Sequence, residues 1–437
     1  MIDPREGKNI QYKVSDMLVS GLSVFFMQCA SFLEYQERME KTYGMNNARS
    51  LFGITKIPTG EQMRNVLDRI PPSALFGIFG WCFDQLVQNG EITSFKSELG
   101  YLLALDGTGH FSSTTIHCND CLIKTEKKTG KKTYYHSALT PVLVKPGGEH
   151  VLSLVPEYIL PQDGDDKQDC ENKACKRWLG TYGRKFSSIE QDIATTALGD
   201  DLYSRQPVME EILEQGLHFV LVCKRESHPW LYDWTDNLDV GKSNEDMHIL
   251  TRREWNGKSH LVSTFKYANN VPLKESKDSL IVNWCEVTVT NEETGKDVYH
   301  NAFITDHLVT QDNVFQIILS GRTRWKIENE NNNTLKTKGY HFEHNYGHGK
   351  EHLSSLLVTL ILLAFLFHTL LDLTHQGYQK VRELIGARIR FFNDIKTLTR
   401  YSFYRNFEHL FSWMHIALTK GQRQPNYALP PPLMYTA

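Results

Sequence analysis

Three acidic residues of this chain occur where carboxylates could bind metal ions. Asp106 and Asp200 each follow an apolar segment, at 102–105 and 193–198, that is typical of a buried strand, and Glu328 lies on a predicted helix. Acidic residues at strand ends often do no more than cap a turn. Three carboxylates at one edge of a sheet could instead hold two Mg²⁺ (or Mn²⁺) ions, because these ions prefer oxygen ligands and a pair of them serves phosphodiester chemistry.

The predicted helix at 321–336 is polar along most of its length. It carries Arg324, Glu328, four asparagines and Lys336, and it has only a thin apolar side. Arg324 precedes Glu328 by four residues, so the two share a helix face, and the simplest interpretation is an ion pair worth about 0.3–0.5 kcal/mol. If Glu328 binds a metal ion, Arg324 is better used on phosphate, which suits its fork of donors.

The composition is that of a soluble protein with two or three domains: 437 residues, 41% hydrophobic and 23% charged. A formal net charge of −3 means that any nucleic-acid binding must come from local patches. Residues 1–8 lack the apolar core of a signal peptide, and eight cysteines do not make a disulfide scaffold in a chain of this size. We therefore expect a reducing cytoplasm.

One apolar run, at 353–371, approaches the roughly 20 residues needed to span a membrane. It is interrupted by Ser354, Ser355 and His368, and aromatic or cationic anchors do not surround it. The run therefore predicts a fully buried core helix and no membrane partner.

The elements that must position these residues form five regions. Residues 1–98 are predicted to be a helical N-terminal DNA-binding domain, with a capping box at Thr59 to Gln62, although short helices joined by tight turns suit other small helical domains equally. Residues 99–245 predict the first part of an α/β core with a mixed sheet. Its expected strands are 102–105, 136–145, 151–160, 193–198 and 218–223, and its expected helices are 169–182 and 207–216.

The second half of the chain is expected to complete this core. Residues 246–306 alternate strand and turn signals and predict an antiparallel β insertion. Residues 307–375 would supply the rest of the core, with the Glu328 helix and the buried apolar helix. Residues 376–437 predict a basic helical region, suited to DNA binding or dimer formation, and a Pro-rich tail at 424–437.

Three blocks of sequence together resemble a known enzyme class. They are Leu105-Asp106-Gly107-Thr108, Gly199-Asp200-Asp201-Leu202-Tyr203 and Arg324-Trp325-Lys326-Ile327-Glu328. Over about residues 100–370 the chain resembles bacterial DDE-class insertion-sequence transposases, which have an RNase H-like catalytic core with a β-strand insertion before the catalytic Glu. The resemblance implies the fold class: an α/β, RNase H-like mixed sheet core with an antiparallel β insertion and helical regions at both ends.

The resemblance also implies catalytic roles. Asp106, Asp200 and Glu328 would hold two Mg²⁺ (or Mn²⁺) ions, and Arg324 would contact phosphate at the transposon end. Asp200 is preferred to its neighbour Asp201 because Asp-x-x-Tyr, ending at Tyr203, matches the family's spacing.

Two positions depart from the family's third block. The family commonly has a Tyr three positions before the Arg, where this chain has Gly321, and a Lys seven positions after the Glu, where this chain has Leu335. Lys336 or Lys338 would take the role of that lysine in binding DNA.

A flipped base is a further expectation from the resemblance. Related enzymes with the insertion can form a hairpin-ended intermediate, in which an aromatic side chain holds a base outside the helix. Trp284 and Trp255 are the candidates for this DNA contact. A tryptophan in a small β unit often belongs to the core instead.

Two further clusters could bind ligands. Cys118 and Cys121 form half of a structural Zn²⁺ site, which His117 or His136 and one of Cys170 or Cys175 would complete. The five lysines between 124 and 132 could contact the DNA backbone or form a solvated hairpin tip. Lys350 follows a Gly-rich turn in a histidine-rich stretch, where it could contact phosphate at a helix start or lie in a solvated loop.

The sequence thus predicts a transposase that binds the ends of an insertion sequence and catalyses Mg²⁺-dependent DNA strand cleavage and strand transfer. Its partners would be double-stranded DNA, both terminal inverted repeats and target, and further copies of the chain in a homodimer or higher oligomer. We would expect such a protein in the bacterial cytoplasm, where it would associate with the nucleoid. The alternatives are a non-catalytic DNA-binding repressor and a stand-alone RNase H-like nuclease.

Overall fold

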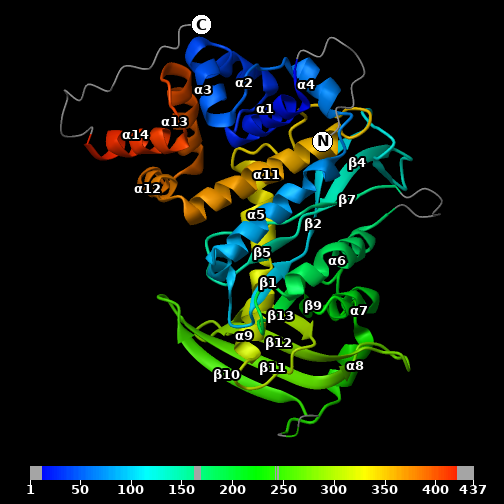
Figure 1. Ribbon diagram of the computed structural model, residues 1–437. Helices are drawn as coiled ribbons and strands as arrows, with labels where there is room; N and C mark the ends of the chain where they lie inside the picture. Colours follow the sequence, from blue (N-terminus) through cyan, green and yellow to red (C-terminus); the bar gives the residue numbers. More distant parts are fainter. Residues whose placement is uncertain (1–11, 162–168, 242, 244–245, 421–437) are drawn as a thin grey trace.

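The computed structural model describes residues 12–161, 169–241, 243 and 246–420 (Figure 1). The N-terminal segment 1–8 and the Pro-rich tail at 424–437 lie outside this part of the chain. Within it, a mixed sheet forms the centre of the molecule, with the strand order β10-β11-β12-β13-β9-β8-β1-β5-β6. The prediction of an α/β protein with a mixed sheet is confirmed.

Five strands form the middle and one edge of this sheet. They are β1 (Tyr101–Ala104), β5 (Val142–Val144), β6 (Leu152–Ser153), β8 (Thr195–Gly199) and β9 (His218–Val222). β1 runs parallel to β8, and β8 runs parallel to β9, whereas β5 is antiparallel to both β1 and β6. Every residue of β1, β5 and β8 is buried, as expected for continuous apolar runs covered on both faces.

The predicted β insertion extends this sheet instead of standing apart from it. Its strands are β10 (His248–Trp255), β11 (His260–Pro272), β12 (Ile281–Asn291) and β13 (Lys296–Thr305). The last residues of β13 are buried and pair antiparallel with β9, with Phe303 opposite Val222. The sequence indicated the strands correctly but gave no sign of this pairing, because alternation within a strand does not identify its neighbour.

A long hairpin, which we call the finger (residues 107–139), projects from the central strands. It consists of β2 (Gly107–Ser113), β3 (Leu122–Thr125) and β4 (Lys132–Leu139), to which β7 (Glu157–Ile159) adds a fourth strand. β2 follows β1 just after Asp106, and β4 leads into β5. At this point the two long strands are joined by a hydrogen bond from the backbone N–H of Thr140 to the carbonyl of Asp106 (3.0 Å). Consequently, Asp106 stands at the base of the finger.

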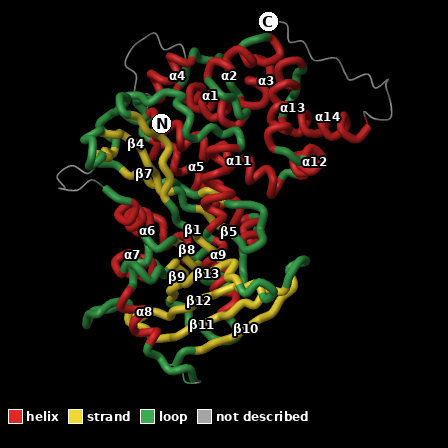
Figure 2. Tube along the Cα trace, turned by 180° about the vertical axis from the view of Figure 1, so that it is seen from behind, coloured by secondary structure: helices red, strands yellow, loops and turns green. Residues whose placement is uncertain are grey.

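Helices cover the sheet and fill the end of the molecule opposite β10–β13 (Figure 1; Figure 2). Those that follow the core strands are α6 (Glu171–Ser187), α7 (Gln206–Glu214), α8 (Pro229–Asp236) and α9 (Val314–Thr323). Those of the N-terminal region are α1 (Val14–Phe26), α2 (Phe32–Met39), α3 (Thr42–Phe52), α4 (Gly60–Leu67), η1 (Pro72–Leu75), α5 (Phe76–Gln88) and η2 (Glu91–Phe95). The capping box predicted at Thr59 and Gln62 is present at the start of α4.

The C-terminal helices α12 (Gln376–Ile385), α13 (Arg388–Tyr401) and α14 (Phe407–Lys420) share a core with the N-terminal helices. Asn47 of α3 is fully buried, and its amide donates to the carbonyls of Thr399 (2.6 Å) and Ser402 (2.7 Å) and accepts from the backbone N–H of Tyr404 (2.8 Å). The described parts of the N-terminal and C-terminal regions, residues 12–98 and 376–420, which the sequence separates, therefore meet in one packed unit.

The apolar run forms α11 (Leu353–Thr374), a helix long and apolar enough to cross a membrane by composition alone. In the structure it packs against α1, α4, α5 and β6, and 72% of its most apolar window is buried. This is the arrangement of a core helix, as the interrupting polar residues predicted.

Asp68, just beyond α4, caps the start of α11. Its carboxylate accepts hydrogen bonds from the backbone N–H groups of Lys350 (2.8 Å), Glu351 (3.1 Å), His352 (3.1 Å) and Leu353 (3.0 Å). Gly349 makes room for it, because this residue has φ +72° and an added Cβ would lie 2.2 Å from the Asp68 carboxylate. The cap therefore fixes the loop that enters α11.

Asp68→Asn is expected to destabilise the protein in a pH-dependent way. Burial tends to raise the pKa of Asp68, but the four backbone hydrogen bonds outweigh it and lower this pKa. A depressed pKa means that the charged cap stabilises the fold above the unfolded value of about 3.9 and loses this effect as pH falls through the folded value. Urea unfolding at pH 7 should show a loss of about 1–2 kcal/mol, and the difference from wild type should shrink at pH 3.

Glu61→Gln, a change to an exposed acid of α4, is the control and should have little effect at either pH. An equal loss at both pH values for Asp68→Asn would contradict the charged cap.

Candidate functional site

Asp106 and Asp200 emerge side by side at one end of the central sheet. Ala104 of β1 lies opposite Leu198 of the parallel strand β8, and the backbone N–H of Leu105 continues the pairing by donating to the carbonyl of Leu198 (2.8 Å). Asp106 follows Ala104 by two positions, and Asp200 follows Leu198 by two positions. The two aspartates therefore lie at the same end of the sheet. This is the juxtaposition that the two apolar runs predicted.

Glycines beside both aspartates allow close packing around the site. An added Cβ on Gly107 would lie 2.4 Å from the carboxylate of Glu171, and one on Gly199 would lie 2.9 Å from the ring of Tyr203. Both distances are below normal van der Waals contact. The glycine after Asp106 and the glycine before Asp200 therefore belong to the construction of the site.

Glu171, the first residue of α6, is a carboxylate of this site that the sequence analysis missed. It accepts hydrogen bonds from the backbone N–H of Gly107 (2.9 Å) and from the hydroxyl of Tyr203. Its only signal in the sequence is an acid in the first turn of a predicted helix, which usually reflects the helix dipole. The Asp-x-x-Tyr spacing thus has a physical meaning, because the buried Tyr203 holds Glu171 beside Asp106.

Glu328 lies on an interrupted helix. The single helix predicted at 321–336 consists of the end of α9, the π-helical segment η3 (Ile327–Asn332) and α10 (Asn333–Thr337). A π-helical turn contains one residue more than an α-helical turn and is often found at functional sites. Arg324 forms the expected ion pair with Glu328, with 2.6 Å between Nη1 and Oε1, and the Glu328 side chain is 51% exposed.

The charges of this helix act on Asp106. Burial is the main reason why the pKa of Asp106 rises from 3.8 to about 7, and repulsion from Glu171 adds to it. Arg324 lowers this pKa by attraction, whereas Glu328 and Asp200 raise it further. The charges of Asp200 and Glu328 therefore both reach Asp106.

The asparagines of the π-helical segment connect this helix to the base of the finger. The amide of Asn332 donates to Oδ2 of Asp106 (3.1 Å), and its oxygen accepts from the hydroxyl of Thr140 (3.1 Å) and from the amide of Asn331 (2.9 Å). The oxygen of Asn331 in turn accepts from the hydroxyl of Ser153 (3.1 Å). These polar residues, which the sequence analysis left without a role, orient Asp106.

Asp201 faces away from this cluster. Its carboxylate accepts from the backbone N–H of Lys224 (2.8 Å) and from the hydroxyl of Ser227, and one of its oxygens lies 3.7 Å from Nε2 of His228. Among the hydrogen bonds of the described residues, the carboxylate of Asp200 accepts only a local one, from the N–H of Leu202 (2.8 Å), and its charge raises the pKa of Asp106. The geometry therefore favours Asp200 over Asp201 as the second acid of the site.

The two departures from the family pattern have physical reasons. An added Cβ at Gly321 would lie 2.6 Å from the ring of Phe303 and 2.9 Å from Val220, so α9 packs too closely on β13 and β9 for a tyrosine here. Leu335 is fully buried, and the lysine follows it at 336. A single π-helical turn moves the residues after it by one position relative to a continuous α-helix.

Lys336 and Lys338 face different hollows. Lys336 forms an ion pair with Glu343 (2.8 Å) and lines a groove of about 1030 Å³ together with Lys124 and Lys131 of the finger. Lys338 is exposed and lines a cavity of about 390 Å³ on the side of α12 and α13. The finger lysines lie on the exposed hairpin of β3 and β4, so both interpretations of them remain predictions.

One of the predicted DNA contacts needs correction. Trp284 is 3% exposed and packs edge-on against Tyr232, with 5.8 Å between ring centroids, so its ring belongs to the core; Trp255 is 57% exposed.

The carboxylate of Asp68 occupies the backbone N–H groups at the start of α11, and the side chain of Lys350 is exposed. A contact of this side chain with phosphate stays a prediction.

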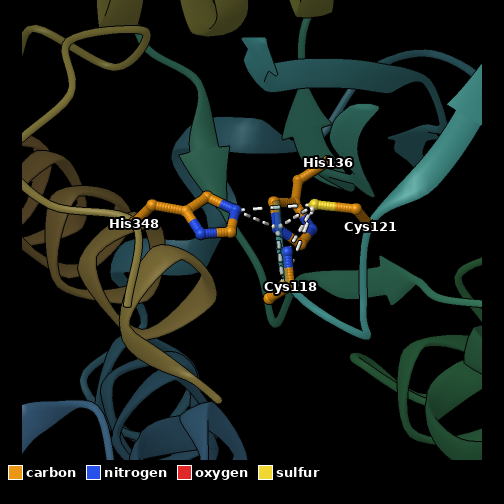
Figure 3. Close-up of side chains that lie close together, drawn as sticks. All are labelled: Cys118, Cys121, His136 and His348. Carbon is orange, nitrogen blue, oxygen red and sulfur yellow. Dashed lines mark hydrogen bonds between the residues drawn. The ribbon is translucent and has the colours of Figure 1, made fainter. Parts of the chain in front are cut away.

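Cys118 and Cys121, in the loop between β2 and β3, gather with two histidines partway along the finger (Figure 3). His136 of β4 is one, as one of the alternatives predicted, and His348, from the loop before α11, is the other. The remaining predicted partners are elsewhere: His117 stacks on Tyr134, and Cys170 and Cys175 belong to the α6 region, outside this cluster of described residues. The histidine spacing of 341–352 gave no metal motif, because the partners of His348 are distant in sequence.

Comparisons of the chain with protein-family models and with curated proteins give no match.

Asp106→Asn is expected to stabilise the protein when metal ions are removed with a chelator. A pKa raised to about 7 means that the folded state holds the proton more tightly than the unfolded state, so stability falls as pH rises from about 4 through 7. The neutral amide removes this penalty and still offers an oxygen to Asn332. At pH 8, denaturant unfolding should show a gain of about 2–4 kcal/mol, which disappears near pH 4.

Asp201→Asn is the matched control. It should lower stability, because its neighbours Lys224 and Ser227 lose a charged acceptor. A loss of stability for Asp106→Asn at pH 8 would contradict the raised pKa of Asp106.

Proposed function

We propose that the chain is a DDE-class insertion-sequence transposase, which cleaves DNA at the ends of its element and joins them to target DNA. The observation that carries this proposal is the convergence of Asp106 and Asp200, from adjacent parallel strands, with Glu328, whose charge raises the pKa of Asp106. These are the three acids of the blocks that resemble the family.

The topology supports an RNase H-like core. The order β6-β5-β1-β8-β9, with β5 antiparallel and β1, β8 and β9 parallel, is consistent with the RNase H-like sheet that the resemblance implies. The strands β10–β13 follow β9 in the chain and precede Glu328, where the resembling family has its β insertion. This sheet places the first two acids on neighbouring strands.

The acids fit a pair of Mg²⁺ or Mn²⁺ ions. Asp106 lies among three other carboxylates and one guanidinium, and Arg324 is already paired with Glu328, so the site has an excess of negative charge and oxygen ligands. Asp106, Asp200 and Glu328 would hold the ions. Bound there, such ions would activate the attacking oxygen and stabilise the leaving oxygen of an in-line displacement.

The protein's own groups orient the acids and bind the DNA. Asn332 holds Asp106, and Tyr203 with the N–H of Gly107 holds Glu171, which therefore supports the site from behind. Arg324 pairs with Glu328, and its charge also acts on Asp106. Its fork of donors suits a phosphate that approaches these acids. Water would attack first to leave a 3′-hydroxyl, which would then attack the target phosphate.

The groove beside the finger suits double-stranded DNA. Lys124, Lys131 and Lys336 lie along it, so cations from the finger and from the Glu328 helix face the same space. Terminal inverted repeats would bind here and over the helical regions, with target DNA and a second copy of the chain completing the assembly in the bacterial cytoplasm. Assembly on paired ends follows from the two cuts that such an element needs.

Glu328→Gln is expected to abolish cleavage and strand transfer while leaving DNA binding intact. The amide keeps the size of the side chain but loses the charge that binds the cation, and such losses typically reduce rates by about 10²-fold or more. The assay uses Mg²⁺ and labelled DNA carrying the inverted repeats from the flanks of the gene, and it separates cut from joined products.

Glu330→Gln, two positions further along the same π-helical segment, is the control and should keep activity. Full strand transfer by Glu328→Gln would disprove the assignment. Cuts without joining by the wild type would indicate a nuclease, and binding alone would indicate a repressor.

Lys336 and Glu343 provide a pair of changes with opposite expected effects. Lys336→Ala removes a cation from the groove, so DNA affinity should fall and the slope of log K against log salt should decrease by about 0.9. Glu343→Ala frees Lys336 from its ion pair and should raise affinity. Titrations of labelled DNA at several salt concentrations would test both, and equal effects of the two changes would exclude Lys336 from the DNA surface.

A further inference from the structure

We propose that Cys118, Cys121, His136 and His348 bind one structural Zn²⁺ ion that ties the finger to the loop before α11. The inference rests on the geometry of these four residues and is independent of the proposed activity.

The donor atoms have the spacing of a tetrahedral site. Zn²⁺ with Zn–S of about 2.3 Å and Zn–N of about 2.0–2.1 Å separates two sulfurs by about 3.8 Å, sulfur and nitrogen by about 3.5 Å, and two nitrogens by about 3.3 Å. The two Sγ atoms here are 3.9 Å apart. Nε2 of His136 is 3.5 Å from Sγ of Cys118 and 3.3 Å from that of Cys121.

His348 completes the tetrahedron. Its Nε2 lies 3.5 Å from Sγ of Cys121 and 3.1 Å from Nε2 of His136. All four donor atoms lie within 4.8 Å of one another, and they point to one centre (Figure 3). Two thiolates and two imidazoles in this arrangement are the ligand set of zinc.

The surroundings of the ligands favour the metal-binding forms. Nδ1 of His348 lies 3.0 Å from the carbonyl of Gly349, so the proton of this ring belongs on Nδ1 and the lone pair of Nε2 faces the cluster. The backbone N–H of Cys118 donates to Sγ of Cys121 (3.4 Å), which stabilises a thiolate. Both contacts resemble those around bound zinc.

Hydrogen bonding alone explains the cluster less well. Nε2 of His136 makes short contacts with three atoms, the two Sγ atoms and Nε2 of His348. A neutral imidazole has at most one proton to share there, which can serve only one of the three. A cation at the centre satisfies all four donors at once.

The site is closed, so its role is structural. Four protein ligands leave no position for substrate, and Cys121, His136 and His348 are 3%, 2% and 7% exposed. Three ligands come from the finger, and the fourth comes from a loop more than 200 residues away that Asp68 fixes to α4. The ion therefore cross-links the finger to the helical end of the molecule, beside the groove that Lys124 and Lys336 line.

Metal content and cobalt substitution test this site in the full-length protein. Purified wild type should contain one zinc per chain by mass spectrometry, and Co²⁺ in its place should give the visible and thiolate absorption bands of a tetrahedral site with sulfur ligands. His348→Ala should lose most of the zinc and these bands, and trypsin should cut the exposed lysines of the finger several-fold faster.

His344→Ala, which changes an exposed histidine of the same loop, should keep the zinc. His348→Cys should also keep it with a changed cobalt spectrum, so that misfolding of His348→Ala is told apart from loss of a ligand. The proposal is overturned if the wild type binds no more zinc than Cys118→Ser/Cys121→Ser, or if His348→Ala retains the zinc and the cobalt spectrum. None of these measurements involves DNA, so they fail independently of the proposed activity.

Discussion

Repulsion among carboxylates is the constraint around which the core is built. Asp106, Asp200, Glu328 and Glu171 are held close enough together that burial and charge raise the pKa of Asp106 to about 7. Several features oppose this repulsion: the parallel pairing of β1 with β8, the glycines at 107 and 199, the hydroxyl of Tyr203 and the amide of Asn332. This arrangement lowers the stability of the fold when Asp106 is ionised.

The sequence predicted what depends on local pattern. Buried strands at 102–105 and 193–198 could be read from apolar runs, and so could the two aspartates that end them. Glu171, Asn332 and His348 could not be found in this way, because each acts on a partner that the chain brings near only by folding. The same reason applies to β13, whose strand was predicted but whose pairing with β9 was not.

Predicted helices raise a related problem, since periodicity assumes a constant number of residues per turn. The helix at 321–336 contains a π-helical segment. The residues after this segment are therefore rotated about the helix axis relative to those before it, although each part keeps the helical period. The displacement of the lysine from 335 to 336 is then a result of backbone geometry, and Leu335 is free to pack in the core.

The finger connects the two sites physically. Asp106 stands at its base. Of the proposed zinc ligands, His136 lies on β4, whereas Cys118 and Cys121 lie in the loop between β2 and β3. The small sheet of the finger gains stability from an attachment to the rest of the molecule. His348 supplies one, through a loop whose position depends on the Asp68 cap. Lys124 and Lys131 of the finger line the same groove as Lys336, so the position of the finger determines how these cations are spaced.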